Sequence, residues 1–376
     1  MPVRLPTHPD ITPWRENRLA VDMRAAAASL PGPPCRIVDA HSHVSGERAP
    51  AIFGEVARAF GVERVITMTP LPMVEPVKAA LGGFIEFMGI PNFRDADRFF
   101  AFADGYLADI EAFRTRYGAR MIKLWNAPPV YEFFQGDRAA IIPLDSPWRV
   151  RQIELAQRLG MGVMVHVADP DTWFKARYTD RSKVPEKREH YRSLERVMDR
   201  FEGPWLGAHM GGSPEDLDFL DTLLARHPNF HIDTSATKWV VRELSKHPRS
   251  RVLEFFDRWR GRILFGSDIV VIDEHLAPLP PPKPGEVRHP RAEQANSPET
   301  AWQLYASRYL ALRLMLETDY DGPSPIADPD LAMVDPSVTD PLAGPRLQGF
   351  ALPTEILREV YRGASEGFFK KAPKTT

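Results

Sequence analysis

The stretch Ile37–His43 reads IVDAHSH and decides how the rest of the chain is interpreted. A short apolar run ends there in an acid and two histidines that are one residue apart. In an extended chain, residues i and i+2 point to the same face, so His41 and His43 would present their imidazoles side by side. Two neutral imidazoles at this spacing form half of a metal site if the fold brings other ligands to the same point. An isolated pair of this kind is more often a strand that runs into a polar loop, so the other strands must decide.

Composition limits the classes of protein that need to be considered. The chain has 376 residues, 43% of them hydrophobic and 26% charged, as is usual for a soluble globular enzyme. Lys plus Arg number 48 against 50 for Asp plus Glu, so no basic excess indicates nucleic acid or an anionic membrane as a partner. Cys35 is the only cysteine, which excludes an internal disulfide and is typical of a reducing compartment. Apolar runs are too short for a membrane span or a signal peptide, so we expect a cytoplasmic protein.

Eight short apolar runs alternate with helical patterns along the chain. Runs of this near-continuous apolar kind are typical of parallel strands that are covered on both faces. The eight predicted strands are Ile37–His43, Val62–Met68, Phe99–Ala103, Met121–Trp125, Gly162–Val167, Trp205–Gly212, Phe230–Ser235 and Arg262–Asp268. The segment from Pro70 to Asp97 is interpreted as a long excursion between the second and third strands.

The spacing of polar residues at the strand ends favours a closed barrel. Four units separate His43 from His166 and two separate His209 from Asp268, which gives about 31 and about 30 residues per unit. A (β/α)8 barrel of about 250 residues predicts about 31. An open doubly wound sheet also alternates strands and helices, but no Gly-rich phosphate loop follows the first strand. The predicted fold class is therefore α/β, a (β/α)8 TIM barrel.

The barrel carries additions at its ends. Residues 1–35 are predicted to be an N-terminal extension, and residues 36–372 to be a single barrel domain. Two proline-rich insertions, 276–300 and 321–349, follow the eighth strand, and the helix Trp302–Leu316 between them should close the barrel. Because the first insertion leaves the strand at its carboxyl end, it is either a lid or wall at the barrel mouth or an arm that contacts another subunit.

Five residues with metal-binding or acid–base chemistry sit at predicted strand ends: His41, His43, His166, His209 and Asp268. Barrel enzymes place their active sites at the carboxyl ends of the strands. Any one of these histidines is more often a hydrogen-bonded core residue than a ligand. Four histidines and one aspartate at matching positions indicate a shared site.

At these residues the chain resembles the amidohydrolase superfamily, in the branch that includes aminocarboxymuconate-semialdehyde decarboxylase and related metal-dependent hydrolases. The resemblance spans about residues 36–370. The motifs that carry it are Asp39–His43, His166, Ala208–Gly212, Asp233–Ala236, Phe265–Asp268 and Leu352–Glu355.

The resemblance implies that His41, His43, His166 and Asp268 bind one divalent ion. Zinc is expected, with manganese, iron or a second ion as alternatives. The ion would activate a water molecule, Asp268 would accept its proton, and His209 would act as an acid–base group or oxyanion stabiliser. Asp233 is expected to orient a ligand or the backbone.

Lys123 leaves two interpretations open. Some superfamily members carry a carboxylated lysine at this strand end, where it bridges two metal ions. In the other interpretation, Lys123 is a structural residue or contacts the substrate, and the site holds one metal ion. We favour one metal. Candidates for substrate binding are Trp125, Arg177 and Lys238, and Trp173 and Trp239 are further candidates for the pocket wall. Arg177 and Lys238 are also explained as solvated charges on the surface.

The predicted function is hydrolysis of a small organic substrate by metal-activated water. The alternative is non-oxidative decarboxylation of an unsaturated or aromatic acid at the same site, and a third hypothesis is an inactive barrel that only binds. A small molecule is the expected partner, nucleic acid and membrane are not, and a homodimer is possible for barrels of this kind.

Overall fold

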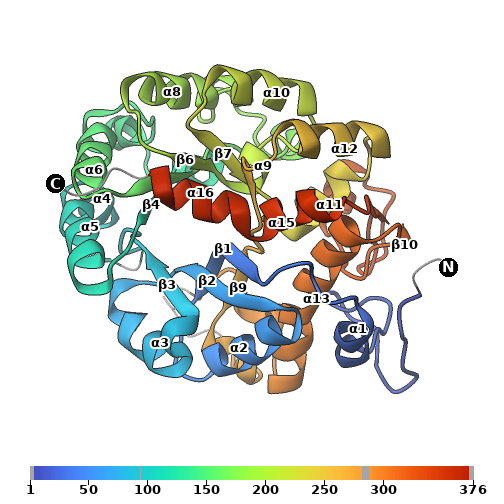
Figure 1. The fold of residues 1–376 in the computed structure, drawn as a ribbon. Helices are drawn as coiled ribbons and strands as arrows, with labels where there is room; N and C mark the ends of the chain where they lie inside the picture. The colour runs from blue at the N-terminus through green and yellow to red at the C-terminus, as the bar shows by residue number, and fades with distance from the viewer. Residues whose placement is uncertain (1–3, 94, 282–287, 372–376) are drawn as a thin grey trace.

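The computed structural model describes residues 4–93, 95–281 and 288–371, and it forms a barrel of parallel strands surrounded by helices (Figure 1). Within these ranges eight strands make the ring. They are β1 (Ile37–Val44), β2 (Val62–Met68), β3 (Ile85–Met88), β4 (Met121–Trp125), β5 (Gly162–His166), β6 (Trp205–Gly207), β7 (Phe230–Asp233) and β8 (Ile263–Leu264). A further short strand, β9 (Ile269–Val271), continues past β8 and pairs with the end of β1.

The strands form two parallel sheets, β3-β2-β1-β9 and β4-β5-β6-β7-β8, that meet at two seams. At one seam Gly89, just after β3, bridges Ile122 of β4, and the Lys123 N–H donates to the Gly89 carbonyl at 2.8 Å. At the other, the Ala40 N–H donates to the carbonyl of Phe265, just after β8, at 2.9 Å. These bonds close the ring, and the predicted (β/α)8 barrel is confirmed.

The predicted third strand was wrong. Residues Phe99–Ala103 lie almost wholly in helix α4 (Arg98–Phe102), and the third strand is β3, inside the segment interpreted as an excursion. The Asp97 side chain accepts a hydrogen bond from the Phe100 N–H at 3.1 Å and so caps the helix. The aromatic rings of α4 then pack against a neighbouring loop, where Phe102 lies 5.1 Å from Phe134. The apolar run therefore serves a helix-to-loop contact rather than the barrel.

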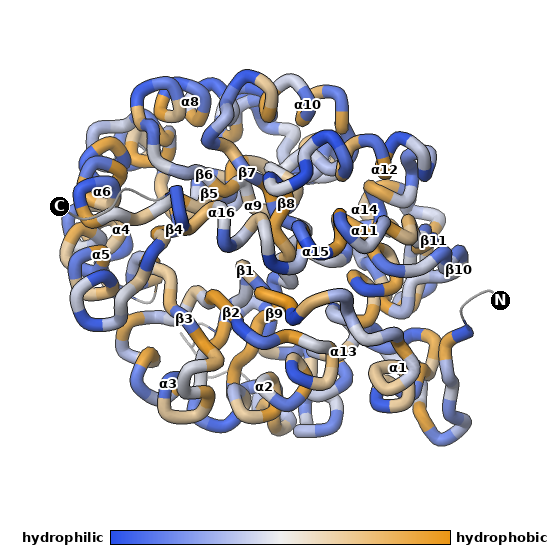
Figure 2. Tube along the Cα trace, viewed as in Figure 1, coloured by the Kyte–Doolittle hydropathy of each residue, from blue (hydrophilic) through white to orange (hydrophobic). Residues whose placement is uncertain are grey.

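Helices cover the outside of the ring, and Figure 2 shows apolar residues concentrated along the strands and the inner sides of these helices. The main covering helices are α2 (Ala49–Ala59), α3 (Val74–Leu81), α5 (Asp104–Tyr117), α6 (Pro147–Arg158), α8 (Lys187–Arg200), α10 (Leu217–Arg226), α12 (Arg249–Arg258) and α13 (Pro298–Glu317). Helix α13 begins at a capping box of Ser297 and Thr300 and packs beside α2. Its Tyr309 ring stacks on Phe265, so α13 covers the β8–β1 seam as predicted.

The C-terminal helical segment closes the amino-terminal end of the barrel. It consists of α15 (Thr354–Arg358), a π-helical turn (Glu359–Gly363) and α16 (Ala364–Lys371), and it crosses the barrel opening in Figure 1. The Phe368 ring lies 5.2 Å from the His231 ring, and a Cβ at Gly162 would lie only 2.8 Å from the Phe368 ring. A glycine is therefore required at the start of β5. With this end covered, the carboxyl ends of the strands are left for a site.

The N-terminal segment packs on the barrel. Helix α1 (Met23–Ser29) lies against α13, and Val21 and Met23 are buried in the main core. The buried Glu16 pairs with Arg308 of α13 and with Lys238, at 3.3 Å from the latter.

The second insertion, residues 321–349, forms a small hairpin and a helix. The hairpin pairs β10 (Asp321–Pro323) with β11 (Arg346–Gln348), and α14 (Asp330–Val334) lies between them. The Arg18 N–H donates to the Pro325 carbonyl at 2.9 Å, so the N-terminal segment and this insertion pack as one layer.

Part of the first insertion, residues 282–287, lies outside the described residues, and so does part of the predicted lid or arm. The residue just before this insertion is held on α13, because His275 Nδ1 lies 3.0 Å from the Tyr305 hydroxyl. None of the helices in the described ranges is long and apolar enough to cross a membrane.

Candidate metal centre

The predicted histidines and aspartate meet at the carboxyl ends of the strands. His41 and His43 come from β1, His166 ends β5, His209 follows β6 and Asp268 follows β8. The His41 ring lies 5.8 Å from the His43 ring and 5.0 Å from the His209 ring, and His166 lies 4.5 Å from His209. The fold therefore gathers all five side chains in one cluster.

Three of these side chains form a group with the geometry of a metal site, which we call the metal triad: His41, His43 and Asp268. Asp268 Oδ1 lies 3.1 Å from His43 Nε2 and 3.4 Å from His41 Nε2. One ligand atom of each residue lies within 4.8 Å of the others. The His43 side chain is 39% exposed, so the triad is open to solvent on one side.

A buried atom of the triad indicates what it binds. His41 Nε2 is buried and has no hydrogen-bond partner among the described residues, although it faces the Asp268 carboxylate. A buried polar atom without a partner is unfavourable, and an imidazole nitrogen beside a second imidazole and a carboxylate is a donor set for zinc and related divalent ions. The residues present therefore fit a divalent metal.

The other nitrogen of His41 is held by the carboxylate that ends β7. His41 Nδ1 lies 2.8 Å from Asp233 Oδ2. Burial raises the pKa of Asp233, but the adjacent His41 and the hydroxyl and N–H groups around it outweigh burial and lower the pKa overall. Asp233 is thus ionised and keeps the proton of His41 on Nδ1, which leaves the Nε2 lone pair facing the triad.

His209 occupies a special backbone position. Its φ and ψ are 60° and 55°, in the left-handed region, and its N–H donates to Asp233 Oδ1 at 2.8 Å. Its Nδ1 lies 2.8 Å from the Ser235 hydroxyl. Burial lowers the pKa of His209 well below its ordinary value, and the neighbouring His166 lowers it further. The imidazole is therefore neutral and can accept a proton. One ligand atom each of His41, His209 and Asp233 also lies within 4.8 Å of the others, which makes a second, fully buried group, and in it His41 Nδ1 and Asp233 Oδ2 are hydrogen-bonded to each other.

His166 lies beside the cluster with one nitrogen already engaged. Its Nε2 is 3.0 Å from Asp169 Oδ1, and Asp169 Oδ2 accepts a hydrogen bond from the Tyr178 hydroxyl at 2.7 Å. These two hydrogen bonds orient the His166 ring so that Nδ1 is the nitrogen left for another partner. Its assignment as a fourth ligand stays a prediction.

Lys123 lies inside the barrel on β4 and is only 6% exposed. Its Nζ is 3.2 Å from Met164 Sδ. Burial lowers the pKa of Lys123 to about 8, against the opposing effect of the Asp233 and Asp268 charges.

For Asp268, burial raises the pKa, but the hydrogen bond from His43 and the nearby imidazoles hold the pKa well below its usual range. The carboxylate is therefore ready to bind a cation.

Asp39 has a role that sequence reasoning missed, although it stands in the opening motif. It is buried and accepts hydrogen bonds from the Ser267 hydroxyl at 2.6 Å and the Tyr309 hydroxyl at 2.8 Å. Asp268, which follows Ser267 in the chain, has a left-handed φ of 57°, and its N–H donates to the His41 carbonyl at 2.7 Å. Asp39 therefore ties β1 to the turn that aims the Asp268 carboxylate.

The residues predicted to bind substrate lie around the mouth of the barrel. Trp125 pairs in register with His166, and its Nε1 is buried without a partner among the described residues. Arg177 is half-exposed and pairs with Glu132 at 3.1 Å. Lys238 pairs with Glu16. The structure does not bring these three together, and their roles stay predictions.

Two further tryptophans line the histidine cluster. The Trp239 ring lies 5.6 Å from the His209 ring and 6.2 Å from the His166 ring, and Trp173 packs on Trp239 at 5.2 Å. We call Trp173 and Trp239 the aromatic wall.

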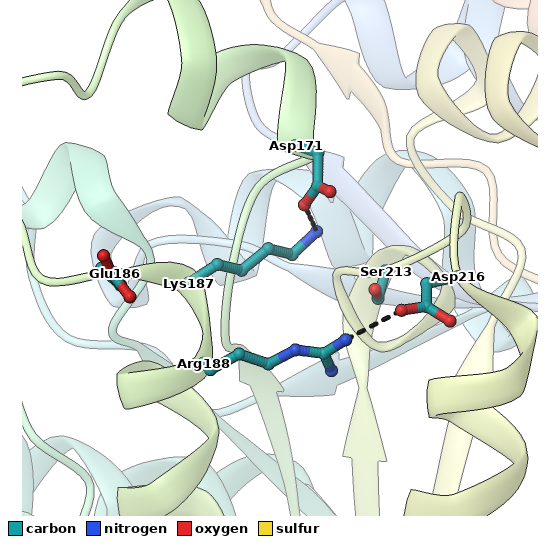
Figure 3. A pocket seen from close by; sticks show the side chains of 6 residues that line it. All are labelled: Asp171, Glu186, Lys187, Arg188, Ser213 and Asp216. Atoms are coloured by element: carbon teal, nitrogen blue, oxygen red, sulfur yellow. Dashed lines mark hydrogen bonds and ion pairs between the residues drawn. The ribbon is translucent and has the colours of Figure 1, made fainter.

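A separate surface pocket of about 210 Å³ lies between the loops that follow β5 and β6. Figure 3 shows that both of its cations are paired with acids: Lys187 points to Asp171 and Arg188 to Asp216, and the ion pairs measure 3.0 Å and 2.8 Å. Because these charges neutralise one another, the strand-end cluster is the stronger candidate site.

A closed parallel barrel with imidazole and carboxylate side chains gathered at the carboxyl ends of its strands has the arrangement in which barrel enzymes build their active sites. The chain matches the family model described as Amidohydrolase over residues 50–369, and it belongs to that family. The family generally binds a divalent metal.

Two solved structures are similar to this chain at low level. A proposed amidohydrolase from Staphylococcus aureus is 12% identical with a TM-score of 0.36, and covers 62% of this chain and 88% of its own. An amidohydrolase from Burkholderia multivorans is 14% identical with a TM-score of 0.34, and covers 74% of this chain and 93% of its own. No curated protein matches the chain.

Proposed function

We propose that this amidohydrolase binds one divalent ion, with zinc expected, through the metal triad and His166, and hydrolyses a carbonyl-type bond of a small organic substrate. The observation that carries the proposal is the unpartnered Nε2 of His41, which faces His43 and Asp268 while Asp233 holds its other nitrogen. When bound, the ion would supply Lewis acidity and make a water molecule easier to deprotonate.

The protein's own groups divide the proton transfers. Asp268 is ionised and 28% exposed, so one of its oxygens can take a proton from an attacking water. His209 is neutral, and its Nδ1 faces Ser235, whose hydroxyl donates to Asp233. This network leaves His209 Nε2 as an acceptor that can receive the proton and pass it to the leaving group.

The aromatic wall gives a reason to keep a second candidate. A flat apolar surface beside the histidines favours a substrate with an unsaturated or aromatic skeleton. On the same site, loss of carbon dioxide from such an acid would make the protein a decarboxylase, in line with the resemblance to the aminocarboxymuconate-semialdehyde decarboxylase branch. There His209 would control protonation at carbon.

Two measurements test these proposals. Metal analysis of the purified protein after reconstitution with zinc should find about one ion per chain, as expected for a stoichiometric site, and much less would contradict the enzyme proposal. A panel of lactones, amides and carboxylated aromatics should then be assayed for product and for carbon dioxide. Release of carbon dioxide without consumption of water would contradict the proposed hydrolase activity and support the decarboxylase.

The proposed partner is therefore a small molecule. A homodimer is proposed as well, and sedimentation of the full chain tests it.

A further inference from the structure

The second insertion reaches the histidine cluster through one carboxylate. Asp330, on α14, accepts hydrogen bonds at Oδ2 from the indole Nε1 of Trp173 at 2.7 Å and of Trp239 at 3.2 Å. Trp173 lies on α7 (Asp171–Ala176) after β5, and Trp239 lies on α11 (Thr237–Leu244) after β7. A single oxygen from outside the barrel therefore joins two of its catalytic-side loops.

Asp330 is itself held in place by a buried ion-pair cluster. Arg242 Nη1 lies 3.3 Å from Asp330 Oδ2 and also contacts Asp328, on the same insertion. The Arg242 side chain is only 3% exposed and is paired with Glu243 at 2.7 Å. Charged partners in this environment are screened little by solvent, so the Asp330 carboxylate has one preferred position.

The two indoles that Asp330 holds are placed to contact a substrate. Trp239 packs edge-on against His209, with the ring planes at 81°, and lies beside His166. Trp173 meets Trp239 at 74°. Both tryptophans are partly exposed rather than buried. An indole held by its N–H keeps its orientation, and a fixed apolar surface binds a flat ligand at low entropic cost.

We propose that Asp330 is a positioning residue that fixes the aromatic wall, so that the second insertion determines which carbon skeleton binds beside the metal triad. The inference rests on the proposed metal-dependent function. It adds that residues 321–349, which lie beyond the eight barrel strands, belong to the substrate site.

Two hydroxamates distinguish the contribution of the aromatic wall to binding from that of the metal. Acetohydroxamate and benzohydroxamate carry the same metal-binding group and differ in the phenyl ring that would lie on the wall. For the zinc-loaded full chain we expect benzohydroxamate to bind about tenfold more tightly, since one buried aromatic contact is worth about 1.4 kcal/mol. Asp330→Ala should reduce this preference to within about threefold and leave the Kd of acetohydroxamate unchanged, and Trp239→Ala should reduce the preference to a similar extent. Asp335→Ala, an exposed aspartate of the same insertion, is the matched control and should keep the full preference.

A spectroscopic signature completes the test. In ¹⁵N TROSY spectra, the indole signals of Trp173 and Trp239, assigned with Trp173→Phe and Trp239→Phe, should shift in Asp330→Ala and stay in place in Asp335→Ala. If Asp330→Ala does not fold, Asp330→Asn keeps the shape and should give an intermediate preference. A tenfold preference that survives in the folded Asp330 variant overturns the inference. If acetohydroxamate fails to bind the wild-type protein, the metal-dependent function has failed instead.

Discussion

Asp233 Oδ2 lies 2.8 Å from His41 Nδ1, and both side chains are fully buried. This contact joins the end of β7 to the end of β1, two strands that are far apart in sequence. It decides which nitrogen of His41 faces Asp268 and His43. The orientation of the metal triad therefore depends on a carboxylate that is not itself in the triad.

Asp233→Asn should weaken metal binding without unfolding the barrel. An amide cannot hold the imidazole proton as a carboxylate does, and loss of such an outer contact typically costs 10–100-fold in metal affinity. Zinc affinity measured by competition with a chelator tests this, with the exposed Asp137→Asn as control. An unchanged affinity in Asp233→Asn would show that His41 is oriented by its other contacts.

His166→Ala and His209→Ala should separate binding from turnover. If His166 is a ligand, His166→Ala loses both metal and activity. His209→Ala should keep most of the metal and lose about 10²–10⁴-fold in kcat, the usual contribution of an acid–base group. Metal content and kcat measured on the same preparations test both. Loss of metal from His209→Ala would make His209 a ligand.

Glu16→Gln should destabilise the protein in a pH-dependent way. Burial raises the pKa of Glu16, but the charges of Arg308 and Lys238 outweigh it and lower the pKa below its ordinary value. A carboxylate with a lowered folded-state pKa stabilises the protein above its unfolded pKa of about 4.3 and loses this as the pH falls. We expect a loss of about 1–3 kcal/mol at pH 7.

Urea unfolding at pH 7 and at a pH near 4 checks the Glu16 prediction. The difference between wild type and Glu16→Gln should be smaller at the acidic pH, because protonation of Glu16 in the unfolded wild type removes part of the stabilisation there. The rest is lost only as the pH falls through the lower folded-state pKa. A difference that is constant with pH would mean that the side chain acts by packing alone.

Sequence reasoning succeeded where a residue's position on a strand decides its environment. The spacing of about 30 residues per unit from His43 to His166 and from His209 to Asp268 is a property of the barrel, and these side chains do meet. It failed at β3, because Ile85–Met88 has only four residues and one of them is Glu86. Nearby, a longer aromatic run imitates a strand but packs in α4.

The supporting residues of the site were less accessible to such reasoning. Asp330 lies 62 positions after Asp268 in a proline-rich insertion, where neither strand nor helix periodicity indicates which way a side chain points. Its contacts with Trp173 and Trp239 arise where the insertion packs on α11, to which Arg242 ties it through Asp328 and Asp330. Tertiary contacts of this kind have no local sequence signal.

Lys123 decides between one metal ion and two, and we predict one. A carboxylated lysine forms from the neutral amine, and with its pKa lowered to about 8 Lys123 is mostly protonated at pH 7 and mostly neutral at pH 9. Carboxylation, if it occurs, should therefore increase with pH in the presence of bicarbonate. Nothing but the Met164 thioether, a weak acceptor, is seen to accept a hydrogen bond from Lys123 Nζ within the described residues.

We therefore expect zinc stoichiometry to stay near one per chain from pH 7 to pH 9 with bicarbonate, and Lys123→Met to keep that ion. The Met variant removes the charge while filling a similar apolar volume, so a folding defect should be small. Metal analysis after gel filtration gives the stoichiometry, and mass spectrometry of the intact protein detects the added carboxylate. A second ion that appears at high pH in the wild type and is missing from Lys123→Met would establish a binuclear site. In that case His166 and His209 would be ligands of the second ion, and their present contacts with Asp169 and Ser235 would describe the metal-free arrangement.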